Sequence, residues 1–120
     1  MKQLINICKM DQLTLKKYVA KQLSATHSNI QFDNGYVFAQ GTMPVLLVAH
    51  LDTVHQNLPQ TILYDETTEA LSSPEGIGGD DRAGIYMVLE VIKKFNCSVL
   101  FCDDEEIGAV GANKFIDTHI

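Results

Sequence analysis

The sequence predicts a layered α/β domain with a largely parallel centre. Two continuous apolar segments, residues 44–49 and 98–102, have the composition of strands buried on both faces. A segment with helical periodicity lies between them, and another, residues 110–118, follows the second strand. Alternating strands and helices with apolar strands are typical of a sheet that carries helices on its faces.

Composition limits the class of protein further. The chain has 120 residues, 15 acidic and 9 basic side chains, and a formal net charge of −6. This length predicts a single domain over residues 1–120, and the 46% of hydrophobic residues suffice for one core. The acidic balance argues against nucleic acid as a partner, and the longest apolar segment is too short to enter a membrane. The three cysteines, Cys8, Cys97 and Cys102, are too few and odd in number for a disulfide framework. This cysteine content predicts a reduced, cytoplasmic protein.

Residues 11–25 have the periodicity of an amphipathic helix. Leu15, Val19 and Leu23 recur on one face, and Asp11 is suited to cap the first turn. Three lysines fall on the other face, which we expect to be solvated: Lys16, Lys17 and Lys21. The helical pattern therefore predicts that only the leucine and valine face packs on the sheet.

The remaining segments are shorter. Residues 4–8 fit either a helix or a strand, and Asp33-Asn34-Gly35 between two β-prone segments, 30–32 and 36–39, predicts a hairpin. Weaker strands are expected at 61–64 and 71–72. A glycine loop at 76–79 precedes a helix whose apolar residues follow helical spacing: Ile85, Val88, Leu89 and Ile92.

Polar residues follow both apolar strands at their carboxyl ends. His50 and Asp52 come after the first strand, and four acidic residues, 103–106, come after the second. Asp80 and Asp81 stand between the glycine loop and the helix, within reach of the same sheet edge. Ligand crevices in open α/β sheets form at this edge, and one histidine with several carboxylates suits a divalent metal.

Each of these groups also has a simpler interpretation. His50 and Asp52 point the same way in an extended segment, so Asp52 can orient a metal-binding imidazole, or His50 is a core histidine with an incidental neighbour. Residues 76–82 fit a phosphate loop without its lysine, a helix cap, or a loop that presents Asp80 as a ligand. Glu105 and Glu106 can serve as a general base and a metal ligand, or they belong to a solvent-exposed turn.

Together the groups form three ordered motifs: residues 48–54 (VAHLDTV), 79–84 (GDDRAG) and 104–108 (DEEIG). They resemble the metal motifs of the dinuclear-zinc exopeptidases, a superfamily that includes peptidase T, carboxypeptidase G and the tetrahedral aminopeptidases. The resemblance implies a three-layer α/β/α fold with a mixed, largely parallel sheet. It also implies a cis peptide bond between Asp80 and Asp81.

The resemblance assigns a role to each matching residue. His50 is a terminal metal ligand oriented by Asp52, Asp80 bridges two metals, Glu106 binds the second metal, and Glu105 is the general base. No ligand role follows for Asp81 or Arg82. The implied reaction is hydrolysis of a peptide or acylated amino acid by water held between two Zn²⁺ ions, with Co²⁺ or Mn²⁺ as alternatives.

The family pattern continues with a later acidic ligand and a later histidine, and many members carry a lid or dimerisation insertion. These residues lie beyond the match, so the resemblance covers the N-terminal part of such a domain and implies a fold incomplete at its C-terminus. Two protein ligands then remain for each metal, which predicts weak zinc binding and no peptidase activity in this chain alone. An inactive pseudopeptidase that serves as a binding or scaffold module, a single-metal amidohydrolase and a homo-oligomer stay open. Neither His55 nor the pair Asp117 and His119 is expected to bind metal.

Overall fold

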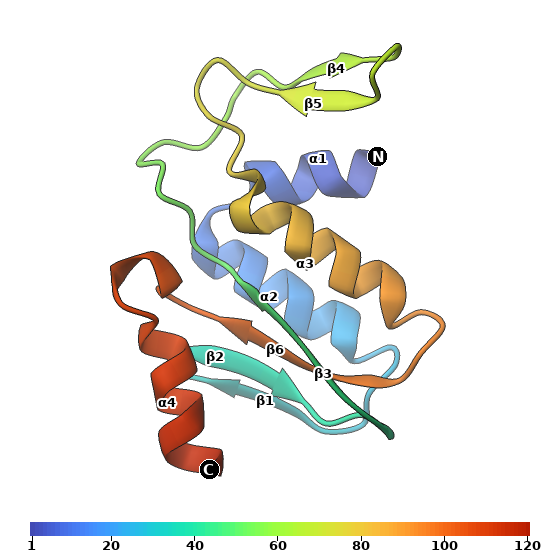
Figure 1. The fold of residues 1–120 in the computed structure, drawn as a ribbon, viewed down its shortest axis with the longest axis vertical. Coiled ribbons are helices and arrows are strands. Elements are labelled where there is room, and N and C mark those ends of the chain that lie inside the picture. Colours follow the sequence, from blue (N-terminus) through green and yellow to red (C-terminus); the bar gives the residue numbers. More distant parts are fainter.

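The computed structural model describes residues 1–120 (Figure 1). Its helices are α1 (Lys2–Lys9), α2 (Gln12–Leu23), α3 (Gly79–Val91) and α4 (Val110–His119), with a short 3-10 helix, η1 (Glu105–Ile107). Its strands are β1 (Ile30–Asp33), β2 (Tyr36–Ala39), β3 (Met43–His50), β4 (Leu63–Asp65), β5 (Ala70–Ser72) and β6 (Cys97–Cys102). The predicted helices, the hairpin of β1 and β2 and the two weaker strands are confirmed, and the ambiguous segment 4–8 is helical.

The main sheet has the strand order β1-β2-β6-β3. Only β3 and β6 run parallel, whereas β1 with β2 and β2 with β6 are antiparallel. The mixed α/β sheet is therefore confirmed, but its largely parallel character is wrong for this chain. The cause is the β1–β2 hairpin, which joins β6 directly and so places an antiparallel pair at the centre of the sheet.

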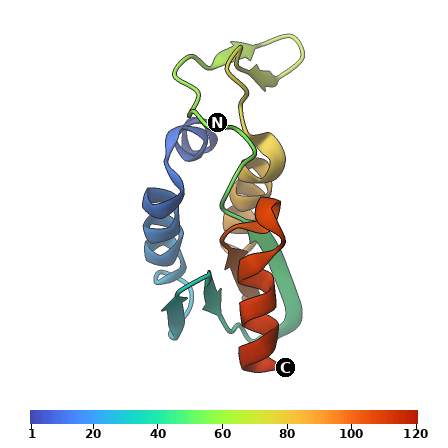
Figure 2. The same cartoon turned by 90° about the vertical axis from the view of Figure 1, so that its left-hand side faces the viewer.

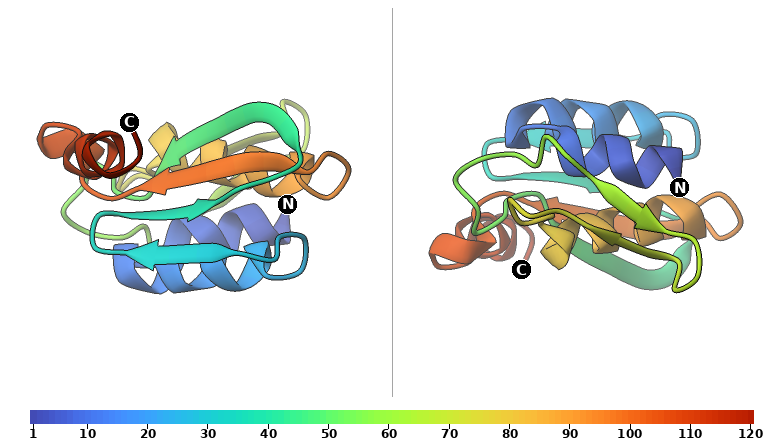
Figure 3. Two further views of the ribbon diagram at one scale, coloured as in Figure 1. Left: turned by 90° about the horizontal axis from the view of Figure 1, so that it is seen from below. Right: turned by 90° about the horizontal axis from the view of Figure 1, so that it is seen from above.

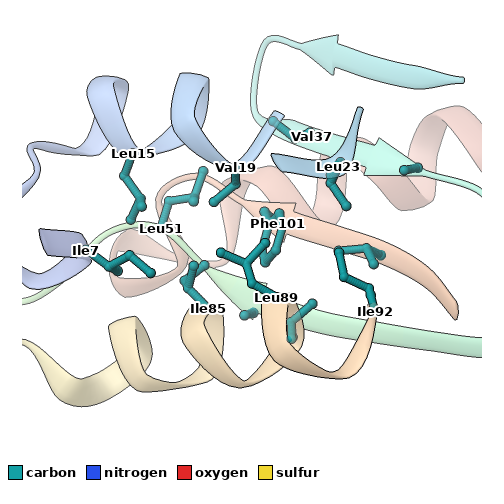
Figure 4. Packing of buried hydrophobic residues seen from close by; sticks show 14 residues of the cluster. Ile7, Leu15, Val19, Leu23, Val37, Leu51, Ile85, Leu89, Ile92 and Phe101 are labelled. Carbon is teal, nitrogen blue, oxygen red and sulfur yellow. The ribbon is translucent and has the colours of Figure 1, made fainter. Parts of the chain in front are cut away.

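Helices cover both faces of this sheet. Helices α1, α2 and α3 lie on one face and α4 lies against β2 and β6 on the other (Figures 1 and 2). Side chains of α2 and α3 converge on Phe101 of β6 between them (Figure 4). The main core thus fixes β6, and with it the position of the turn that follows Cys102.

Strand β3 contradicts the expectation of a strand buried on both faces. It is the edge strand, hydrogen-bonded to β6 alone, and five of its eight residues are exposed. Ala49 packs under α3, but Val48 on the opposite face is 55% exposed because α4 packs over β2 and β6 instead. An apolar sequence therefore did not distinguish an edge strand from a central one.

Lys16 also differs from its predicted environment. Helix α2 begins after Asp11, whose carboxylate accepts the Thr14 N–H at 2.7 Å, as expected of a cap. Lys17 and Lys21 are exposed, but Lys16 is buried and paired with Asp103. A long side chain next to an apolar stripe can turn towards the core when an anion is available there.

Strands β4 and β5 form a separate two-stranded hairpin beyond the first turn of α3 (Figure 1; the right-hand view of Figure 3 shows it from above). None of the four helices has the length and apolar character needed to cross a bilayer.

Candidate metal centre

Three predicted ligands from three separate motifs meet at the carboxyl end of β3. Ligand atoms of His50, Asp80 and Glu106 all lie within 4.8 Å of one another. The His50 Nε2 atom lies 2.9 Å from Asp80 Oδ1 and 3.8 Å from Glu106 Oε1. Glu105 Oε2 is also 3.8 Å from the same nitrogen. The structure therefore brings the predicted ligands and the predicted base around one point.

Asp52 orients the imidazole of His50. The His50 Nδ1 atom is 2.9 Å from the Asp52 carbonyl oxygen and 3.2 Å from its Oδ1. Both partners accept, so Nδ1 carries the proton and Nε2 is directed towards Asp80 and Glu106. This is the arrangement in which the second nitrogen of a metal-binding histidine is held by a carboxylate or a carbonyl.

Asp52 also holds the turn that carries the two glutamates. Its side chain is 7% exposed overall, and its two oxygens accept the backbone N–H groups of Glu105 and Glu106, each at 3.0 Å. These N–H groups open η1, where the unpaired donors of a helix start face a carboxylate. One buried carboxylate thus fixes the relative positions of His50, Glu105 and Glu106.

The charges in this cluster shift two pKa values. Burial alone would lower the pKa of His50, but hydrogen bonds to Asp80 and Asp52 and the charge of Asp81 raise it above the ordinary value. Burial, followed by the charges of Glu105 and Asp80, raises the pKa of Glu106. Repulsion from the Glu105 and Asp80 carboxylates thus adds to the effect of burial on the pKa of Glu106.

Consecutive residues of the second motif contact consecutive residues of the first. Asp80 meets the His50 ring, and Asp81 Oδ2 accepts the His50 backbone N–H at 3.1 Å. Arg82 Nε donates to the Leu51 carbonyl at 3.0 Å. The Asp80–Asp81 peptide bond is cis, as expected from the resemblance.

Sequence reasoning missed the contributions of Asp81 and Arg82. The sequence placed Asp81 at the sheet edge beside Asp80, but its contact with the His50 main chain depends on the path of the loop before α3. For Arg82 a signal existed: with Ile85 and Leu89 it falls on the buried face of α3. Helical periodicity therefore placed a charged residue among core positions.

The acidic run 103–106 divides into two pairs with different surroundings. The Asp103 and Asp104 carboxylates accept hydrogen bonds from Gln12 Nε2 on α2, at 2.9 and 3.1 Å. Glu105 and Glu106 turn instead towards His50. The first pair anchors the turn to α2, and the second pair is presented at the site.

The other histidines near these motifs lie outside the cluster. The ring of His55 packs over the α-carbon of Gly76. His119, at the end of α4, stacks on Phe115 with ring centroids 4.2 Å apart and contacts Gln31 at 3.0 Å. The three cysteines are buried free thiols, as predicted. The candidate metal-binding cluster, His50, Asp80 and Glu106, thus draws its residues from the three motifs.

No family model matches the chain, and no curated protein matches it. The chemistry of the site must therefore be inferred from its own residues and from the three motifs that they form.

Proposed function

We propose that this domain hydrolyses a peptide or related amide bond at a divalent metal held by His50, Asp80 and Glu106, with Glu105 as the general base. The observation that carries the proposal is the convergence of these side chains on His50 Nε2. A three-layer zinc-exopeptidase-like architecture and a Zn²⁺ ion, or Co²⁺ or Mn²⁺ in its place, are part of the same proposal.

The donor set fits such an ion. One imidazole nitrogen and two carboxylate oxygens are ligands that zinc accepts, and catalytic zinc holds three protein ligands and a water. Ligand atoms on a tetrahedral ion with bonds of about 2.0–2.1 Å are separated by roughly 3.3 Å. The separations of 2.9 and 3.8 Å from His50 Nε2 to Asp80 and Glu106 bracket this value.

The residues of the chain have distinct roles in the proposed reaction. Asp52 keeps the proton on His50 Nδ1, which leaves Nε2 free as a ligand. When bound, the ion would polarise the scissile carbonyl and lower the pKa of water towards about 7. Glu105, about half exposed, accepts the proton of the attacking water and returns it to the leaving nitrogen, so that an amine departs.

The convergence on one point favours the single-metal form of this reaction, an amidohydrolase, over the two-metal form that the resemblance implies. Counting by motif gives two ligands to each of two ions, but the structure gathers three ligand atoms around one position. We therefore expect one ion per chain. Under this candidate, His50, Asp80, Glu106 and Glu105 suffice for turnover without the later ligands of the family pattern.

Metal titration and activity assays on the full chain test both candidates. Calorimetry with Zn²⁺ should show one site, lost in Glu106→Gln and retained in Glu66→Gln, a control in the exposed β4–β5 turn. A panel of dipeptides and N-acetyl amino acids is then assayed with Zn²⁺, Co²⁺ and Mn²⁺. Turnover that Glu105→Gln abolishes, with metal binding intact, supports the single-metal reaction. Binding without turnover supports the two-metal reaction, which needs further ligands. Absence of both contradicts a metal centre and favours the binding or scaffold module.

A further inference from the structure

Arg82 is the most deeply buried charged side chain of the molecule, at 2% exposure, and the proposed chemistry does not use it. Its Nε donates to the Leu51 carbonyl at 3.0 Å, and its Nη1 donates to the carbonyls of Ile7 and Met10 at 2.6 and 2.8 Å. None of the ion pairs in the structure includes Arg82. The three hydrogen bonds of the guanidinium therefore all go to main-chain oxygens.

A buried cation without a paired anion is not explained by packing. Burial lowers the pKa of Arg82, which reflects the cost of taking the charge out of water. An apolar side chain of similar volume fills such a position at lower cost. What an arginine offers in return is several donors in a fixed planar fork, which lysine does not reproduce.

The three carbonyls connect two parts of the chain that are distant in sequence. Ile7 and Met10 lie at the C-terminal end of α1, where carbonyls lack the usual partner four residues on; that of Ile7 also accepts the Met10 N–H at 3.3 Å. Leu51 is the residue between His50 and Asp52. The side chains of Ile7 and Leu51 belong to one core cluster (Figure 4). Arg82 thus spans from the end of α1 to the main chain of the metal centre.

We propose that Arg82 is a positioning residue of the metal centre and that α1, through its terminal carbonyls, is part of the support of that centre. This inference rests on the proposed function. By holding the Leu51 carbonyl, Arg82 fixes the peptide planes between His50 and Asp52. That segment sets both the direction of the His50 ring and the place of the Asp52 carboxylate, which in turn holds Glu105 and Glu106.

A purely structural role gives a different expectation. If Arg82 only stabilised the fold, its loss would lower stability and leave the remaining folded molecules with an unchanged site. A positioning role predicts that the folded molecules themselves bind metal less tightly. It also predicts that the His50 ring loses its fixed hydrogen bonds before any metal is added.

The variants Arg82→Lys and Arg82→Gln test this in the full chain. The control is Leu23→Ala, which removes a fully buried side chain at the end of α2 far from the site. Two quantities are measured: Zn²⁺ affinity of the folded chain by calorimetry, and the imidazole ¹⁵N signals of His50 in the metal-free protein. We expect both Arg82 variants to bind Zn²⁺ at least about tenfold more weakly, the effect typical of residues that orient metal ligands. Their His50 signals should shift towards an averaged tautomer, whereas Leu23→Ala should change neither quantity.

Wild-type Zn²⁺ affinity together with unchanged His50 signals in Arg82→Lys would overturn the inference. Failure of Arg82→Lys to fold would overturn it as well, because Arg82 would then be required for folding itself. If Arg82→Gln alone does not fold, Arg82→Lys decides. Absence of Zn²⁺ binding in the wild-type chain would instead contradict the proposed function. In that case the metal-free His50 signals still report whether Arg82 positions the ring.

Discussion

Lys16 on α2 lies 2.6 Å from Asp103, and the two side chains are only 8% and 13% exposed. The same ammonium group donates to the Asp33 carbonyl at 2.6 Å. Lys16 therefore joins α2 to the end of β1 and to the turn that leads into Glu105. A residue expected on the solvated face instead helps to set the position of the third motif.

Replacement of Lys16 by methionine should destabilise the protein by about 3 kcal/mol, because it leaves the Asp103 carboxylate buried without its cation. Urea unfolding followed by circular dichroism measures this difference. The control is Lys17→Met, on the exposed face of the same helix, which should change stability by less than about 0.5 kcal/mol. Equal unfolding midpoints for the two variants would contradict the importance of the buried pair.

Asp52→Asn should weaken the proposed metal centre although Asp52 is not itself one of its ligands. The carboxylate accepts from Glu105, from Glu106 and from the His50 ring, and an amide group would turn its NH₂ towards one of these donors. We expect a loss of metal affinity of about 10- to 100-fold, measured by calorimetry. Asp65→Asn is the matched control, because Asp65 also accepts two backbone N–H groups, but in the β4–β5 hairpin. Equal affinities in the two variants would count against the role of Asp52.

Cys102 should be chemically inert in the folded protein. Burial, assisted by the charge of Asp103, raises the pKa of its thiol to about 11. At pH 8 about one molecule in a thousand then carries the thiolate, the form that reacts. Labelling with a chromogenic disulfide reagent should be slow in buffer and complete in guanidinium chloride. Rapid labelling of Cys102 in the native chain, located by mass spectrometry, would show that β6 is accessible.

Asp11 should make the stability of α2 depend on pH. Its bond to the Thr14 N–H lowers the pKa of the carboxyl below 3.8, so its contribution is present above the unfolded pKa and is lost as pH falls through the folded pKa. Asp11→Asn keeps a capping side chain without a titratable group. Thermal unfolding of both chains should show a wild-type advantage at pH 7 that shrinks as pH falls below the unfolded pKa of the Asp11 carboxyl. A difference independent of pH would refute the assignment.

The sequence was informative wherever local pattern decides structure. The periodicity of Leu15, Val19 and Leu23 predicted α2, and Asn34-Gly35 predicted the first hairpin. The position of His50 at the carboxyl end of a strand and that of Asp80 at a helix start predicted their meeting, because strand ends and helix starts share one edge of the sheet.

Pairing between distant segments was not predictable in the same way. The apolar composition of β3 is compatible with a central strand or with an exposed edge, and only the number of its neighbours decides between them. The sequence could not predict that the two halves of the acidic run 103–106 have different partners, since its first two residues bind Gln12, more than 90 positions away. Such contacts depend on how α2 lies against the turn, which no local pattern encodes.

The free edge of β3 has a consequence for growth of the sheet. The Leu51 N–H donates to Cys102, so by alternation the N–H groups of Leu46 and Val48 point away from β6. The His50 N–H points away as well, but the Asp81 carboxylate already occupies it. An added strand would therefore find main-chain partners at Leu46 and Val48 and lose them at His50. The sheet could therefore extend along Leu46 and Val48 without pairing at the carboxyl end of β3, where the histidine and the carboxylates lie.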